Sequence, residues 1–128
     1  MLLDTHVVLW LLTDDPQLGV RSRAQIEEAT AVHVSTGTLW EIAIKNDLGR
    51  LDVPDQLPDL IETSGLRWLP VSAGHAWAVR DTTGLPHRDP FDRLFATQAR
   101  IEELPLLTAD RALLGADVTG LVTVDARQ

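Results

Sequence analysis

The sequence predicts an α/β fold in which helices cover both faces of a parallel sheet. Short apolar runs alternate along the chain with longer segments of helical periodicity, and this alternation is typical of parallel sheets. Apolar residues make up 45 % of the 128 residues, which is enough to form a packed core. The length is that of one ordinary domain, so we expect residues 1–128 to form a single domain.

The first part of the chain contains two predicted strands and three predicted helices. Residues 1–3 form a short apolar strand, and residues 5–14 form a helix that stops before a proline. Residues 21–30 follow a helical pattern with polar outer positions. Residues 31–35 alternate between apolar and polar side chains, which predicts a strand. Residues 36–47 form the third helix, and a glycine turn follows it.

The middle of the chain contains the clearest helical pattern. Residues 54–63 form a helix with a proline near its start, residues 66–71 a strand, and residues 73–81 a further helix. The longest predicted loop covers residues 82–89 and holds a glycine and a proline. In residues 90–103 apolar side chains recur at helical spacing.

The last part of the chain completes the set of strands. Residues 104–108 form a strand, residues 111–114 a short helix, and residues 121–124 a fifth strand. Binding and catalytic sites in parallel sheets form at the carboxyl ends of the strands, so reactive residues at those ends are candidate site residues.

Composition excludes several classes of protein. The formal net charge of −8 disfavours a protein that grips nucleic acid through a broad basic surface. The absence of cysteine excludes disulfide scaffolds, thiolate metal sites and cysteine nucleophiles. The longest apolar run, residues 7–12, is far shorter than the roughly 20 residues of a membrane span, and no signal peptide is evident. We therefore expect a soluble, cytoplasmic protein with no membrane partner.

Four acidic residues lie near strand ends or helix starts. Asp4 closes the first strand, and Asp110 follows the fourth strand by two residues. Glu41 lies in the helix directly after the second strand, and Asp92 lies in the first turn of the helix at 90–103. Helix capping is a simpler explanation for the aspartates, because a carboxylate at a helix start accepts backbone N–H groups.

The same explanation applies to Asp89, which directly precedes a proline at the start of its helix. Glu41 is harder to explain in this way. The residues around it make its helix apolar nearly all round, which predicts a mostly buried helix and a costly buried carboxylate. Lys45 is the structural alternative as its partner, but an exposed pair at this spacing contributes only about 0.3–0.5 kcal/mol. A cation shared with other acids would compensate the carboxylate better.

A cluster of carboxylates favours a hard divalent cation. Two like charges about 4 Å apart repel by roughly 4 kcal/mol at an effective dielectric of 20, so a cluster needs a proton or a cation between its members. Oxygen ligands select Mg²⁺ or Mn²⁺. The four histidines form no HExxH pair, and we expect His6 and His87 to be solvent-facing or supporting residues rather than ligands.

Four segments, taken in order, carry a family resemblance. They are LLDTHV at 2–7, LWEIAIK at 39–45 with LGRL at 48–51, LPHRDPFDRL at 85–94 and LTAD at 107–110. Through these segments the chain resembles PIN-domain ribonucleases, and more closely the VapC toxins of type II toxin–antitoxin modules. The resemblance implies a PIN-like fold with strand order 3-2-1-4-5, which places the first and fourth strands, and hence Asp4 and Asp110, side by side.

The resemblance also implies the site. By it, one or two Mg²⁺ ions, with Mn²⁺ as an alternative, are bound by the acidic quartet Asp4, Glu41, Asp92 and Asp110. Thr5 and Thr108 are expected to support the quartet, and Asp89 to support it as a helix cap. The implied activity is hydrolysis of RNA phosphodiesters, with transfer RNA preferred over ribosomal RNA as the substrate. The implied partners are a cognate VapB-like antitoxin and a second copy of the chain, in a homodimer or a toxin–antitoxin hetero-oligomer.

Arginines near the acids are candidates for RNA contacts. Arg88 and Arg93 flank Asp92, and Arg111 follows Asp110, so these arginines form a local basic rim in this interpretation. The alternative is that they are ordinary charges on solvated helix surfaces.

The four tryptophans point either to the core or to protein partners. We expect Trp40 and Trp68 in the core. Trp10 lies on a helix with more apolar surface than one sheet face covers, which favours an interface there.

Rival functions fit the residues less well. A haloacid-dehalogenase-like enzyme needs a second aspartate two residues after Asp4, where His6 stands. A receiver domain needs an acidic pair near its start and a late lysine, and the chain has neither. A catalytically inactive PIN-like module that binds RNA or protein is the remaining alternative, and the intact quartet argues against it.

Overall fold

The computed structural model describes residues 1–85 and 89–128. Its strands form one all-parallel sheet in the order β3-β2-β1-β4-β5, which confirms the predicted order. In the central strand, Leu3 pairs with Val34 on one side and with Leu107 on the other. The strands are β1 (Leu2–Leu3), β2 (His33–Ser35), β3 (Arg67–Leu69), β4 (Leu106–Thr108) and β5 (Thr123–Asp125).

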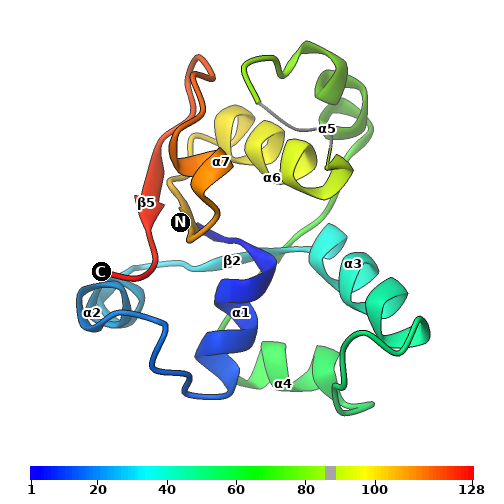
Figure 1. Ribbon diagram of the computed structural model, residues 1–128, viewed down its shortest axis with the longest axis vertical. Coiled ribbons are helices and arrows are strands. Elements are labelled where there is room, and N and C mark those ends of the chain that lie inside the picture. The colour runs from blue at the N-terminus through cyan, green and yellow to red at the C-terminus, as the bar shows by residue number, and fades with distance from the viewer. Residues whose placement is uncertain (86–88) are drawn as a thin grey trace.

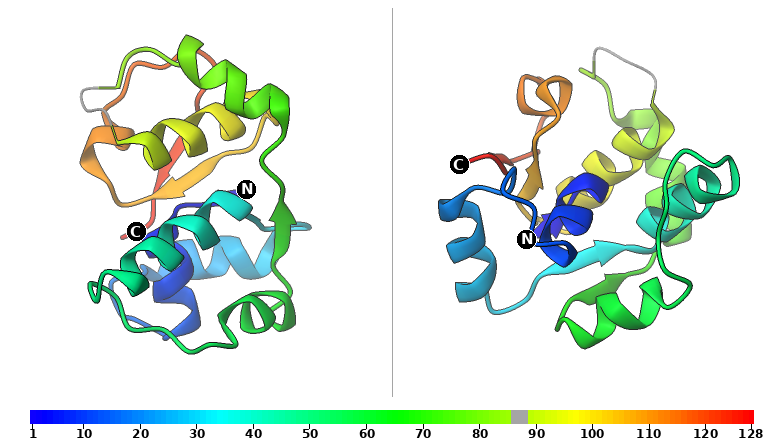
Figure 2. Two further views of the ribbon diagram at one scale, coloured as in Figure 1. Left: turned by 90° about the vertical axis from the view of Figure 1, so that its right-hand side faces the viewer. Right: turned by 60° about the horizontal axis from the view of Figure 1, so that its bottom comes forward.

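Helices cover both faces of the sheet, as predicted (Figures 1 and 2). Successive residues of a strand point to opposite faces, so Leu3 belongs to a core with α1 and α4, while Leu2 belongs to a second core with α6. The helices are α1 (Thr5–Leu12), α2 (Val20–Glu28), α3 (Thr36–Asp47), α4 (Leu57–Thr63), α5 (Ala73–Ala78), α6 (Pro90–Ile101) and α7 (Arg111–Leu114), with a 3₁₀ turn at Val79–Asp81.

Several predicted boundaries differ from the structure. The helix predicted at 54–63 begins only at Leu57, with Pro58 in its first turn, because Pro54 belongs to the turn that precedes it. The strand predicted at 66–71 pairs with its neighbour only at Arg67–Leu69. Apolar patterning extends beyond the residues that form ladder hydrogen bonds, so the predicted strands are longer than the observed ones.

Two expectations about α3 are wrong. We expected Trp40 in the core, but 63 % of its surface is exposed, and its ring packs edge to face on Phe91 at a centroid distance of 5.2 Å. The helix is also not mostly buried, because only one stripe of it, around Glu41 and Ile42, faces the protein. Its apolar side chains surround the helix, and composition alone does not identify the stripe that is covered.

The other two tryptophans of interest are half-buried. Trp68 lies on β3 and donates its ring N–H to Glu62 Oε1 at 2.8 Å. Trp10 packs partly against the core on α1, with its ring beside that of His6. In the described parts of the chain, no helix has the length and apolarity needed to cross a membrane.

Candidate active site

A cavity of about 440 Å³ lies at the carboxyl ends of β1 and β4, beside α3 and α6. All four acids of the predicted quartet line this cavity, although they come from four different elements. Its lining consists of Asp4, Thr5, His6, Leu9, Glu41, Lys45, Arg50, Leu51, Asp89, Asp92 and Asp110. The parallel sheet produces this meeting, because it directs the ends of β1, β2 and β4 to one edge.

Asp4 is held from both sides. It follows β1 and caps α1, where its Oδ1 accepts the backbone N–H of Thr5 at 2.8 Å. Its Oδ2 accepts the Thr108 hydroxyl at 2.7 Å and lies 3.6 Å from Nδ1 of His6. Only 3 % of Asp4 is exposed, and burial raises the pKa of its carboxyl, although His6 and the Thr108 hydrogen bond oppose the rise. The cap interpretation therefore describes Asp4, and the same residue lines the cavity.

Glu41 is oriented by two neighbours. Its Oε1 accepts the Thr5 hydroxyl at 2.5 Å, and its Oε2 lies 2.8 Å from Nζ of Lys45. Thr5 is also 3.2 Å from the hydroxyl of Thr38, so the contact joins α1 to α3. Lys45 is thus the structural partner considered from the sequence. The pair lines the cavity rather than the outer surface of the helix, since Glu41 is 8 % exposed.

Asp92 has the most perturbed carboxyl of the described site. It lies in the first turn of α6, and its pKa is raised to about 8. Burial is the largest cause, because it disfavours the charged form. Repulsion from the neighbouring carboxylates adds to it, in the order Asp4, Asp89, Asp110 and Glu41.

Asp89 and Asp110 are both helix caps. Oδ1 of Asp89 accepts the backbone N–H groups of Phe91 and Asp92, which fixes the start of α6. Oδ1 of Asp110 accepts the N–H groups of Ala112 and Leu113 at the start of α7. Oδ1 makes these capping contacts in both residues, and both residues also line the cavity.

The donor set fits a hard divalent cation. The cavity offers carboxylate oxygens, and a cation would relieve their mutual repulsion, which adds to burial in raising the pKa of Asp92. In the described parts of the chain, no three acidic or histidine side chains are already gathered into a metal cage. Thr5, Lys45 and Thr108 hold two of the carboxylates in their present positions, so cation binding would have to draw the side chains together.

Three further residues, which the sequence did not include in the predicted site, also line the cavity. His6 accepts the backbone N–H of Ala109 through Nε2 at 2.8 Å and so ties the β4–α7 turn to α1. Lys45 and Arg50 add two cations on the α3 side. Their positions in the sequence could have identified Lys45 and Arg50 as neighbours of the site. Lys45 lies one helical turn after Glu41, and Arg50 follows the end of the same helix.

The arginines predicted as a rim lie in different surroundings. Arg93 is half-buried, and its Nη2 donates to the carbonyl of Val79 at 2.8 Å and to that of Thr82 at 3.3 Å. Arg111 is exposed at the start of α7. Arg88 lies outside the described residues.

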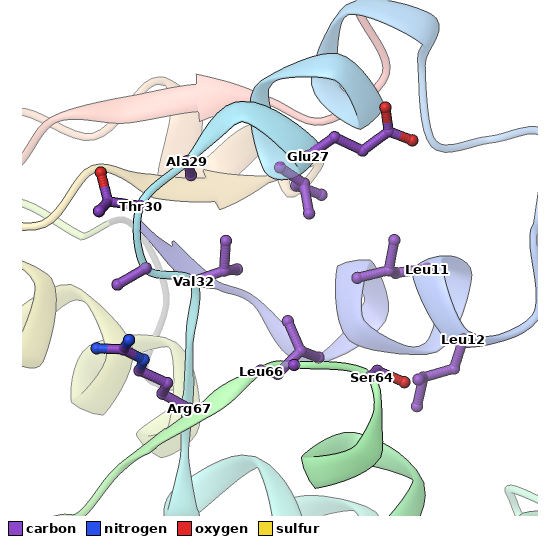
Figure 3. A pocket seen from close by; sticks show the side chains of 12 residues that line it. Leu11, Leu12, Glu27, Ala29, Thr30, Val32, Ser64, Leu66 and Arg67 are labelled. Carbon is purple, nitrogen blue, oxygen red and sulfur yellow. The ribbon is translucent and has the colours of Figure 1, made fainter.

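A second cavity, of about 490 Å³, lies at the opposite, amino-terminal edge of the sheet (Figure 3). Apolar side chains such as Leu11, Val32 and Leu66 form much of its wall, and Glu27 and Arg67 are its charged residues. With a single carboxylate in its lining, it does not offer a cation the ligands that the smaller cavity offers.

Comparison with known proteins agrees with this architecture. A family model described as PIN domain matches residues 1–118. No curated protein matches the chain.

Three solved structures, each 16–21 % identical to the chain, share its fold. VapBC2 from Rickettsia felis, bound to a DNA fragment from its promoter, has 16 % identity and a TM-score of 0.71, covering 96 % of each chain. DNA-bound VapBC from Salmonella typhimurium has 21 % identity and a TM-score of 0.67, covering 97 % of this chain and 96 % of that one. A toxin–antitoxin complex from Klebsiella pneumoniae has 18 % identity and a TM-score of 0.60, covering 98 % and 96 %.

Proposed function

The chain belongs to the PIN-domain family, and we propose that it is a Mg²⁺-dependent endoribonuclease, the toxin of a VapBC-type toxin–antitoxin module. The observation that carries the proposal is the single cavity that Asp4, Glu41, Asp92 and Asp110 line together. Four carboxylates from four elements are costly to assemble without a cation, so their assembly supports a metal-dependent reaction.

The four acids have different roles in this proposal. Asp4 and Asp92 are the most direct ligands, and Asp110 and Glu41 complete the site. Mg²⁺, with Mn²⁺ as an alternative, would be held by these four acids and, when bound, would lower the pKa of a water and neutralise charge on the phosphoryl group. Asp92 must give up its proton for this role, because its pKa of about 8 keeps much of it protonated at neutral pH in the cation-free protein. Glu41, fixed by Thr5 and Lys45, is positioned to help deprotonate the water.

The substrate in this proposal is RNA, with transfer RNA preferred over ribosomal RNA. A net charge of −8 leaves local contacts as the means of binding a polyanion. Arg111 is exposed beside Asp110 and remains a candidate contact. We do not include Arg93 among the proposed RNA contacts, because its Nη2 donates hydrogen bonds to backbone carbonyls.

A cognate antitoxin is the proposed protein partner. The three similar structures are toxin–antitoxin complexes, and two of them contain DNA. An acidic cavity also attracts a basic segment of a partner protein. We propose that the chain assembles with such an antitoxin, as a homodimer or within a hetero-oligomer, and mass measurement of the co-expressed pair tests this assembly.

RNA-end sequencing after brief expression tests the function in cells. We expect new 5′ ends at a small set of sites with the wild-type chain and their absence with Asp4→Asn. The antitoxin, when co-expressed, should suppress the same ends. Equal cleavage by Asp4→Asn, or no new ends with the wild type, would contradict the proposal.

A further inference from the structure

Two cations line the acidic cavity on one side only. Lys45, in the last turn of α3, and Arg50, in the turn that follows, are the lysine and arginine of a lining that otherwise carries five carboxylates. The walls from β1, α1, β4 and α6 contribute four acids, Thr5, Leu9 and His6. The one acid of the α3 side, Glu41, is paired with Lys45. The α3 side is therefore where an anionic strand meets the least repulsion.

The backbone around Arg50 is built to hold it there. Its N–H donates to the carbonyl of Lys45 at 2.9 Å, and the side chain of Asn46 donates to the carbonyl of Leu51 at 2.9 Å. Gly49, which directly precedes Arg50 in this turn, has a φ of 70°, in the left-handed region that favours glycine. These contacts fix the position of Arg50 relative to Lys45 before any ligand binds.

Both side chains retain capacity for a phosphate. In the described parts of the chain no ion pair involves Arg50, whose guanidinium is exposed and suits a phosphate in a two-point contact. Lys45 uses one of its three donors on Glu41, and its side chain is 48 % exposed. Arg93 differs in this respect, because its Nη2 binds the backbone.

We propose that the RNA strand crosses the α3 side of the cavity and that Arg50 and Lys45 bind its phosphates. This inference rests on the proposed function and adds to it the path of the substrate. It also accounts for RNA binding by a protein of charge −8, because two fixed cations at the rim offset the acids locally while the rest of the surface stays acidic.

Salt-dependent binding tests the inference without relying on cleavage. The probe is a short fluorescein-labelled single-stranded oligoribonucleotide of mixed sequence, titrated in EDTA with the Asp92→Asn chain at several KCl concentrations. Each phosphate contact on a single strand contributes about 0.7 to the slope of log affinity against log salt. We expect Arg50→Ala to lower the slope by about that amount and the affinity several-fold. Arg67→Ala, an exposed arginine at the opposite edge of the sheet, is the matched control and should change neither.

Lys45 needs a control for its contact with Glu41. Lys45→Gln should lower the slope and Lys45→Arg should restore it. Lys45 could instead act only by neutralising Glu41. In that case the double variant Lys45→Gln/Glu41→Gln would recover the parent salt slope, and this result would overturn the assignment of Lys45 as a phosphate contact. We expect the double variant to keep the reduced slope.

The glycine turn offers a second, independent variant. Gly49 and Gly65 both have positive φ and open space where a Cβ would lie, so an alanine at either position strains the backbone to a similar degree. Both variants should lose similar thermal stability, but only Gly49→Ala should weaken RNA binding. An unchanged slope in Arg50→Ala, with binding by the parent chain intact, overturns the inference and leaves the proposed function standing. Failure of the wild-type chain to bind or cleave any RNA overturns both.

Discussion

The Thr108 hydroxyl donates a hydrogen bond of 2.7 Å to Oδ2 of Asp4 and so joins the ends of β4 and β1 at the acidic cavity. The same hydroxyl oxygen accepts the backbone N–H of Asp110 at 3.0 Å. A single fully buried threonine thus orients one acid of the quartet and fixes the backbone of a second.

Replacement of Thr108 by valine should therefore damage the site and the fold together. Valine keeps the shape but removes both hydrogen bonds, which leaves a buried carboxylate and a backbone N–H without this partner. We expect a loss of about 1–3 kcal/mol in the free energy of unfolding, measured in urea, and weaker Mg²⁺ binding by calorimetry. Thr108→Ser keeps the hydroxyl and should retain most of both properties. Equal Mg²⁺ affinity in Thr108→Val and wild type would argue against this role.

The sequence predicted the strand order and the positions of the acids at element ends better than it predicted which side chains are exposed. Asp4 and Asp110 are identifiable because a cap position just after a strand is a local feature of the chain, and Asp89 because it precedes a proline at a helix start. Parallel strands then bring such positions to one edge whatever lies between them. The prediction for Trp40 failed, because the covered stripe of α3 depends on how the helix is rotated against its neighbours.

The side-chain contacts of the basic residues could not be predicted from the sequence either. Arg93 lies next to Asp92 in the chain, yet its Nη2 reaches the carbonyls of Val79 and Thr82. Arg50 is far from most of the acids in sequence and lines their cavity. Side-chain direction, which depends on tertiary packing, separates these two arginines.

Stability of the cation-free protein should fall as pH rises from about 4 to about 8. The folded state holds the proton of Asp92 up to a pKa of about 8, whereas the unfolded chain releases it near 3.8, so the folded state binds more protons in this window. The raised pKa of Asp4 acts in the same direction. Urea unfolding in EDTA at several pH values measures the trend, and Asp92→Asn should flatten it. A free energy of unfolding that rises with pH and is unaffected by Asp92→Asn would contradict this.

The same shift predicts that Mg²⁺ binding releases protons. Below about pH 8 the cation must displace the proton of Asp92, so affinity should increase as pH rises through this range. Calorimetry in buffers of different ionisation enthalpy measures the released protons directly, and a release in Asp92→Asn equal to that of the wild type would exclude Asp92 as their source.

Asp89 and Asp92 both lie at the start of α6, but we expect only Asp92 to be needed for RNA cleavage. Asp89→Ala removes the cap contacts to Phe91 and Asp92 and should cost about 1 kcal/mol of stability, while Asp89→Asn should keep the cap. Both Asp89 variants should retain RNA cleavage, since Asp89 supports the site rather than forming it. Loss of cleavage in a stably folded Asp89→Asn chain would move Asp89 into the metal site.

Arg93 should behave as a structural residue. Arg93→Ala removes the hydrogen bonds to the carbonyls of Val79 and Thr82, and we expect a loss of about 2 kcal/mol in the free energy of unfolding. The salt slope of RNA binding should stay at the parent value. A reduced slope with unchanged stability would restore Arg93 to the RNA-binding rim.

Cleavage by Asp92→Asn decides whether the four acids form a metal-dependent RNA-cleaving site. The purified wild-type chain should cleave RNA with Mg²⁺ or Mn²⁺ and stop when EDTA is added. Asp92→Asn should remain folded, because the neutral amide resembles the protonated carboxyl that the cation-free protein holds. It should lose more than about 100-fold of the rate, beyond the 10–100-fold typical of residues that only support metal ligands. Cleavage by Asp92→Asn at the wild-type rate, or wild-type cleavage that persists in EDTA, would contradict the claim.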